Sequence, residues 1–169
     1  SVLFFCEVAK AECLEFLNVS EDKCRIVPHP RFPKKQYTFE EASGIVKDEL
    51  GITLQKDNFI FLVFGQISHY KGLDDIVKSF AELNKGTLII AGRLKRDNEE
   101  LHRYLMGKCA EIEHFYLREQ FINDDVVAAL HNVASVCVFN HKRIFSSGSI
   151  ELALSYDLPV IARNEGCIT

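Results

Sequence analysis

The chain has 169 residues, of which 47% are hydrophobic and 26% charged, with a formal net charge of −4. That length suits one compact domain, or one domain with a short piece of another, and the apolar fraction favours a buried core over a disordered chain. The sequence contains no apolar run of about eighteen residues, so we predict no membrane-spanning helix. The mild acidic balance lacks the basic footprint of a nucleic-acid-binding protein but leaves room for a local anion pocket.

Six cysteines are scattered along the chain, at positions 6, 13, 24, 109, 137 and 167. None are spaced as CxxC, and no Cys/His clusters have the spacing of a zinc site, so we expect no metal. Cys137 lies in the apolar run VCVF, where a reduced cysteine packs as a small hydrophobe. This usage indicates a reducing, cytoplasmic environment.

The first forty residues differ in pattern from the rest. Glu7–Leu17 has the spacing of a helix and Cys24–Val27 that of a short strand. The following segment, Pro28–Lys35, holds three of the four prolines, which favours a semi-rigid linker. A helix over Phe39–Leu50, ended by Gly51, comes next. We therefore expect residues 1–40 to be the tail of a preceding domain with an interdomain linker, and 41–169 to be the domain proper, within a longer polypeptide.

Apolar runs and helical patterns alternate in the second part of the chain. The runs lack in/out alternation, which indicates strands buried on both faces of a parallel sheet. The predicted strands are Phe59–Phe64, Thr87–Ala91, Ile112–Leu117, Val136–Phe139 and Pro159–Ala162. The predicted helices are Leu73–Leu83, Asn98–Cys109, Asp124–His131 and Ser149–Tyr156. This order predicts the α/β class, with a doubly wound, Rossmann-like parallel sheet.

The loop after the first predicted strand of this domain is a candidate phosphate site. In open parallel sheets, ligands bind beyond the carboxyl ends of the strands. Gly65 follows the strand directly, and Lys71 stands before the next helix, where a cation opposes the helix dipole unless an anion lies nearby. A phosphate contact and an ordinary solvated lysine both explain this pattern, and the local sequence favours the lysine. Neither a P-loop nor GxGxxG is present.

The stretch from Ser147 to Glu151 is a second candidate. Small residues around Gly148 at a helix start leave amide groups free to bind an anion. Glu151 lies one turn inside the helix and could accept hydrogen bonds from ribose hydroxyls, or simply favour the helix dipole from the third position. The sequence weighs these two roles equally. The six histidines are scattered, only His69 and His141 fall in ligand-side loops, and no Ser-His-Asp order or GxSxG elbow is present.

Taken together, the segments resemble the C-terminal, nucleotide-sugar-binding domain of a bacterial group 1 (family 4) GT-B glycosyltransferase. The matching segments span nearly the whole chain in order: RIVPHP, FLVFGQISHYKGLDDIVKSF, TLIIAGRLK, FYLREQFINDDVVAALHNVASVCVF and SSGSIELALSYDLPVIARNEGC. The resemblance implies a two-domain enzyme whose N-terminal domain holds the acceptor. It also implies that this half alone is inactive.

The resemblance implies a role for each matched residue. Lys71 and Glu151 would be the catalytic contacts, to the donor diphosphate and to the ribose hydroxyls. Gly65 would leave room for the diphosphate, and Arg93 would lie near the pocket. The remaining positions expected to line the nucleotide are Gln66, Phe121, Ile122, Ser147, Gly148, Ser149 and Ile150.

The implied activity is hexosyl transfer with retention, from a nucleotide-sugar to a glycan or lipid-linked acceptor, in polysaccharide or glycoconjugate biosynthesis. No cofactor is implied, because the nucleotide-sugar is itself the substrate. Relatives carry Arg where this chain has Gln66, and an acid where it has Arg143, eight positions before Glu151. These departures leave open a non-catalytic domain derived from the same fold. A nucleotide-sugar 2-epimerase is a second alternative, because it shares the fold and a helix start with small residues before an acid. The full-length enzyme would be cytoplasmic, with peripheral membrane association left open.

Overall fold

The apolar runs form the strands of a parallel sheet in the computed structural model, which describes residues 1–17, 19–96, 98–142 and 147–164. The five strands of this sheet are β3 (Ile60–Phe64), β4 (Thr87–Gly92), β5 (Phe115–Glu119), β6 (Val136–Phe139) and β7 (Val160–Ala162). All six positions of β4 are buried, because helices cover both faces of the central strands. The predicted α/β class and doubly wound sheet are confirmed.

The order of strands in the sheet is β5-β4-β3-β6-β7. From β3 the chain first builds outward through β4 to β5, then returns to the other side of β3 and continues through β6 to β7. The winding direction therefore reverses between β3 and β6, and the helices that follow these two strands, α3 (Leu73–Leu83) and α6 (Gly148–Ser155), pack on opposite faces of the sheet. Such a switch point leaves a crevice at the carboxyl ends of the strands, where ligands of open α/β sheets bind.

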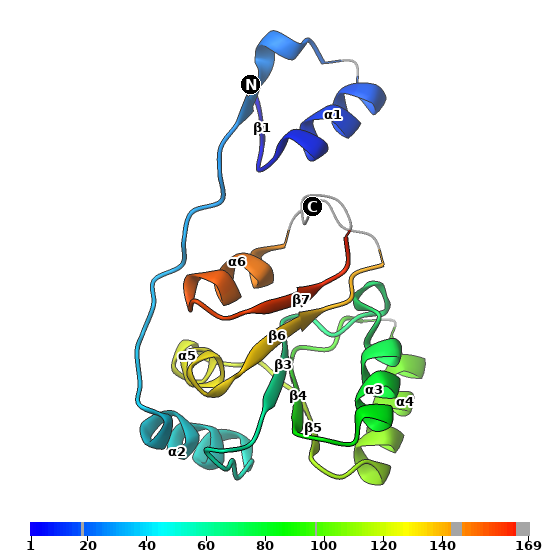
Figure 1. Cartoon of the computed structure of the whole chain (residues 1–169). Helices are drawn as coiled ribbons and strands as arrows, with labels where there is room; N and C mark the ends of the chain where they lie inside the picture. Colours follow the sequence, from blue (N-terminus) through cyan, green and yellow to red (C-terminus); the bar gives the residue numbers. More distant parts are fainter. Residues whose placement is uncertain (18, 97, 143–146, 165–169) are drawn as a thin grey trace.

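Helices pack on both faces of the sheet, and each face has its own hydrophobic core (Figure 1). On one face lie α3 (Leu73–Leu83) and α4 (Glu99–Glu111). The other face carries α2 (Phe39–Leu50), α5 (Asp124–Val133) and α6 (Gly148–Ser155). None of the described helices is both long and apolar enough to cross a membrane.

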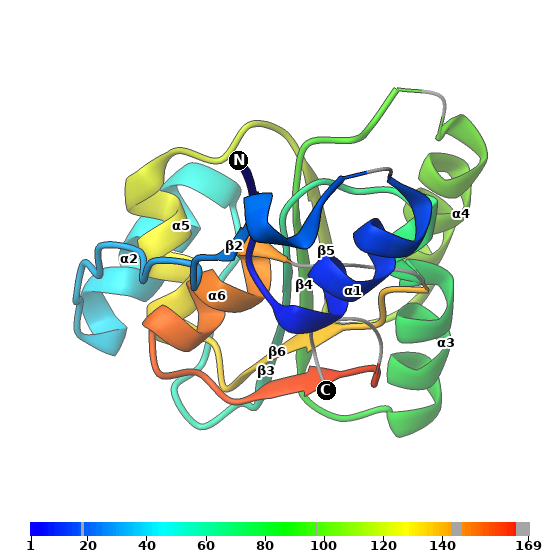
Figure 2. The ribbon, with the colours of Figure 1, turned by 90° about the horizontal axis from the view of Figure 1, so that it is seen from above.

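A small N-terminal unit stands apart from the sheet, beyond the carboxyl ends of its strands (Figures 1 and 2). It consists of β1 (Val2–Phe4), α1 (Glu7–Phe16), a short 3-10 turn over Glu21–Lys23 and β2 (Cys24–Ile26), with β1 and β2 paired in parallel. A three-residue core of Phe4, Ala9 and Cys24 holds it together. An extended segment then runs from this unit to α2 at the opposite end of the sheet (Figure 1).

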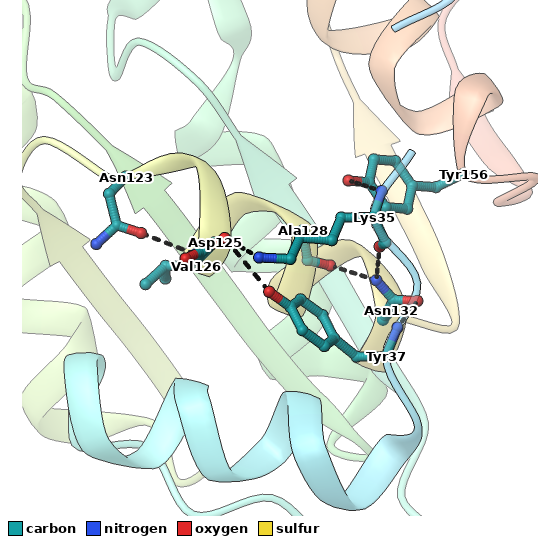
Figure 3. Close-up of polar contacts among 8 residues, drawn as sticks. All are labelled: Lys35, Tyr37, Asn123, Asp125, Val126, Ala128, Asn132 and Tyr156. Atoms are coloured by element: carbon teal, nitrogen blue, oxygen red, sulfur yellow. Dashed lines mark hydrogen bonds and ion pairs between the residues drawn. The ribbon is translucent and has the colours of Figure 1, made fainter. Parts of the chain in front are cut away.

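The extended segment is fastened to two helices along its length. The amide of Phe32 donates to Ser155 Oγ of α6, at 3.0 Å. Further on, Lys35 Nζ pairs with Asp125 Oδ1 of α5 at 2.5 Å, and Asn132 Nδ2 of α5 donates to the Lys35 carbonyl at 2.9 Å (Figure 3). The segment expected to be a linker is thus extended, as its prolines predict, but its second half is part of the domain surface.

The boundary between α4 and β5 differs from the predicted one. The sequence pattern predicts a helix ending at Cys109 and a strand starting at Ile112, whereas α4 continues to Glu111 and β5 starts at Phe115. His114 adopts a left-handed conformation (φ 60°) in the turn between them. Ile112 is apolar because it packs against the core from this turn, and it therefore resembles a strand residue in the sequence. Cys137, expected as a small core hydrophobe, is fully buried on β6.

Leu62 tests the packing of the central strand. Its side chain is 0% exposed, so Leu62→Ala removes buried methyl groups and leaves a cavity, which we expect to cost about 2–5 kcal/mol of unfolding free energy. Leu154→Ala is the matched control, because Leu154 is 46% exposed on α6 and should change stability by less than about 0.5 kcal/mol. Urea unfolding of the three proteins measures both values, and equal costs for the two variants would contradict this packing.

Candidate functional site

The carboxyl end of β3 brings together residues from three segments. Gly65 follows β3 with φ 109°, and a Cβ built on it would lie 2.8 Å from Ser149 Oγ and 2.9 Å from Lys71 Nζ. A Cβ built on Gly92, at the end of β4, would lie 1.9 Å from the Gly65 carbonyl oxygen. Gly92 is therefore required by the close approach of backbone, and Gly65 is favoured by its positive φ. Lys71 and Ser149, which are 78 positions apart in the sequence, therefore lie close together over the Gly65 backbone.

Lys71 is a buried cation without an acidic partner. It ends the short 3-10 turn His69–Lys71, is 5% exposed, and donates from Nζ to the Phe64 carbonyl at 3.1 Å. Within the part of the chain that the structure describes, no carboxylate pairs with it. Burial lowers the pKa of its ammonium group to about 8. A buried charge that lacks a counter-charge is costly, and such groups are concentrated at binding sites.

The first turn of α6 supplies amide donors beside this cation. Ser147 precedes the helix and makes no side-chain capping bond. The amides of Ile150 and Glu151 already donate to the Ser147 carbonyl, at 3.1 and 3.2 Å. Among the described residues, the amides of Gly148 and Ser149 have no acceptor. These two amides are free to bind an anion at the positive end of the helix, whereas the Ile150 side chain lies in the core.

Glu151 does not perform the capping role that its position suggested. It occupies the first turn of α6 and is partly buried. A capping glutamate would accept from the amide of the residue before the helix, but Ser147 and Glu151 form no such bond, and no ion pair to the Glu151 carboxylate is found among the described residues. Its carboxylate still lies in the first turn, where an acid favours the helix dipole, so the helix-dipole and ribose-binding interpretations both stay open.

Arg93 and Phe121, predicted from separate loops, meet at the edge of the sheet. The Arg93 guanidinium carbon lies 5.6 Å from the centre of the Phe121 ring, a cation–π contact. Phe121 is 70% exposed, so its ring presents a flat apolar surface of the kind on which a base can stack. Ile122 instead points into the core, 7% exposed, and Gln66 lies on the surface. Arg143 lies outside the described residues.

Lys142 adds little unbalanced positive charge to the site. Its ammonium group lies 3.4 Å from Asp74 and 3.8 Å from Asp75, so two acids of α3 balance it. Its amide donates to the Tyr70 carbonyl at 2.7 Å, which ties the loop after β6 to the loop after β3.

Two histidines reach this region in a way that the sequence could not reveal. His141, which the sequence placed only in a ligand-side loop, is buried next to Lys71. His29, from the extended segment, lies between the rings of Phe5 and Phe32. Its Nδ1 is 3.0 Å from the Pro30 carbonyl, and its Nε2 lies 3.9 Å from a Cβ built on Gly148. No spacing signal marks either residue, because both are placed by tertiary packing.

A hollow lies at the opposite end of the sheet and contains none of the predicted site residues. It measures about 510 Å³ and is lined by surface turns that include Asp57, Lys85 and His114. Its charges are mixed in sign and its lining residues come from the amino ends of the strands, where open parallel sheets do not bind their ligands. The carboxyl-end cluster therefore remains the candidate site.

The burial of Lys71 predicts a pH dependence of stability. Its pKa is about 8 in the folded chain, below the usual 10.5, so the unfolded chain binds more protons between these values and stability contributed by this group rises with pH. Relative to Lys71→Met, the wild type should gain about 2 kcal/mol between about pH 7 and pH 9.5. Denaturant unfolding at each pH measures the difference. The exposed Lys47, changed to Met, is the control, and a flat difference for both variants would show that Lys71 is not buried as a cation.

No protein-family model and no curated protein matches the sequence. Solved structures do match. A glycosyltransferase from Rickettsia africae has a TM-score of 0.78 at 17% identity, over 98% of this chain and 45% of that one. Sucrose-phosphate synthase from Thermosynechococcus elongatus has a TM-score of 0.73 at 22% identity, over 99% of this chain and 41% of that one.

HepE from Anabaena, in complex with UDP and glucose, matches with a TM-score of 0.74 at 13% identity, over 98% of this chain and 44% of that one. The chain spans less than half the length of these three proteins. At these identities the likeness concerns the fold. The chain has the Rossmann-like fold of the C-terminal half of GT-B glycosyltransferases.

Proposed function

We propose that this chain binds the diphosphate of a nucleotide-sugar and is the donor half of a glycosyltransferase. The observation that carries the proposal is the unbalanced Lys71 ammonium, which lies against Gly65 and Ser149 at the topological switch point of the sheet. A diphosphate there would supply the missing negative charge, and the free amides of Gly148 and Ser149 would donate to its oxygens.

The other unengaged groups of the site fit the rest of a nucleotide. The Glu151 carboxylate, one turn inside α6, would accept hydrogen bonds from ribose hydroxyls. The Arg93–Phe121 pair would stack on the base. Support comes from the structural neighbour HepE, which is described in complex with UDP and with UDP-glucose. In this proposal no metal or cofactor is required.

The proposed reaction is transfer of a hexose to a glycan or lipid-linked acceptor, with retention of the anomeric configuration, in polysaccharide or glycoconjugate biosynthesis. In the transition state negative charge develops on the departing diphosphate. Lys71 and the amides at the start of α6 would stabilise this charge without reorganisation, because the scaffold already fixes them. The acceptor would be held by a second domain, so the chain alone would bind donor without transferring it. Peripheral membrane association would belong to the complete enzyme, in the cytoplasm.

We expect Lys71→Ala and Glu151→Ala each to weaken nucleotide binding by about 10- to 100-fold, because each removes a charged hydrogen-bond partner worth about 1.5–3 kcal/mol. Thermal-shift and calorimetric titrations of the chain with UDP, GDP and ADP measure the affinity and identify the nucleoside. The exposed Lys47→Ala is the matched control and should bind as the wild type does.

The same titrations separate the proposal from its alternatives. Binding that is insensitive to both substitutions would place the nucleotide elsewhere. Wild-type protein that binds none of the three nucleotides would favour a domain that kept the fold without the donor site. Conversion of a free nucleotide-sugar to its epimer, measured by NMR on the complete protein, would indicate the 2-epimerase instead.

A further inference from the structure

Two loop segments face each other across the candidate site. One is Tyr70–Gly72, after β3, and the other is Asn140–Lys142, after β6. The Lys142 amide donates to the Tyr70 carbonyl at 2.7 Å, and Asn140 Nδ2 donates to the Gly72 carbonyl at 3.1 Å. The first residue of each segment is therefore bonded to the last residue of the other. This pairing holds the two central residues, Lys71 and His141, opposite each other.

His141 is a buried base with unused hydrogen-bonding capacity. Its side chain is 1% exposed, and its ring stacks on Tyr70 at 5.4 Å and lies near-parallel to Phe139 at 5.9 Å. Nδ1 is buried with no hydrogen-bond partner, and no hydrogen bond to either ring nitrogen is found among the described residues. A buried polar atom of this kind is uncommon in proteins and calls for a physical reason.

The charges around His141 keep it neutral in the empty site. Burial, and to a smaller extent the positive charge of Lys71, together lower the pKa of His141 to about 4. Asp74 and Asp75, the acids of α3 that follow Lys71 in the chain, pair with Lys142, and the Tyr70 ring stacks on His141. In the described part of the chain no carboxylate pairs with His141. Lys71 and His141 thus face each other at a site where no carboxylate of the described residues supplies negative charge.

We propose that His141 takes up a proton when the diphosphate of a nucleotide binds beside Lys71. This inference rests on the proposed function. An anion within about 4–6 Å favours the charged form of a histidine and offsets the repulsion from Lys71. The imidazolium then donates to the anion and becomes a second cationic contact. Nucleotide binding is thereby coupled to proton uptake, so affinity rises as pH falls, by up to about tenfold per pH unit for one proton.

A purely structural role for His141, as one ring in an aromatic stack, predicts a different behaviour. His131 provides the comparison within the same molecule: it is 2% exposed, its Nε2 has no partner, and it contacts the rings of Phe64 and Tyr156. Burial lowers its pKa as well, but no cation contributes to that shift. If His141 only packs, both rings should stay neutral when nucleotide binds.

The test is calorimetric titration of the chain at about pH 6.5 in buffers of different ionisation enthalpy, which counts the protons taken up on binding. UDP-glucose, GDP-mannose and ADP-glucose are the probes, because a diphosphate esterified at both ends does not itself titrate near this pH. Lys71 is almost fully protonated there, so uptake reports on His141. Long-range ¹H–¹⁵N NMR of the histidine rings, with and without the bound probe, observes His141 and His131 separately in the wild-type protein.

We expect the wild type to take up about half a proton or more on binding, and His141→Phe, which preserves the ring stack, to bind more weakly with little uptake. The NMR signals should change to those of an imidazolium at His141 while His131 stays neutral. A probe that binds without proton uptake, or with His141 still neutral, overturns this inference and leaves the proposed function intact. If none of the probes binds, the proposed function fails and the inference fails with it.

Discussion

The ammonium group of Lys71 is held against the Phe64 carbonyl, no acid of the described residues pairs with it, and the rest of the site depends on this unbalanced charge. In an isolated domain such a group reduces stability, since burial of the cation is uncompensated. The chain keeps it where the winding of the sheet reverses, next to two free helix amides. The cation, the amides and the reversal of the strand order all favour the same kind of ligand, a phosphate-bearing anion, and this agreement supports the site more strongly than any one of the three.

The scaffold that positions Lys71 relies on close backbone contacts. Gly92 approaches the carbonyl of Gly65, and Gly65 in turn lies under Lys71 and Ser149, so the ends of β3 and β4 and the start of α6 are fixed relative to each other. The extended segment adds a connection from outside the sheet, because it is bonded to α5 (Figure 3) and to α6. It also places His29 near Gly148. In a two-domain enzyme this segment would connect the acceptor domain to the start of α6, so a movement of that domain would be transmitted to α6.

Much of this architecture follows from the sequence, and the parts that do not have identifiable causes. Val, Ile and Phe runs without alternation predict buried strands, and Thr38 with Glu41 forms a capping box at the start of a helix predicted from Phe39. The sequence pattern predicts the start of β5 three residues too early. The cause is Ile112, which packs its apolar side chain against the core from the turn before the strand. The roles of Glu151 and His141 depend on contacts between loops far apart in the sequence, which local patterns do not encode. The predicted contacts of the site residues with a nucleotide, including that of Gln66, stay predictions.

The central claim, that the carboxyl ends of β3 and β6 with the start of α6 bind the diphosphate of a nucleotide, is tested most directly by backbone amide NMR during a titration with UDP, GDP or ADP. The account predicts that the amide signals of Gly65, Gly148 and Ser149 shift together and saturate with one affinity. Shifts confined to the hollow at the amino ends of the strands, around Lys85 and His114, or no shifts with any of the three nucleotides, would contradict it.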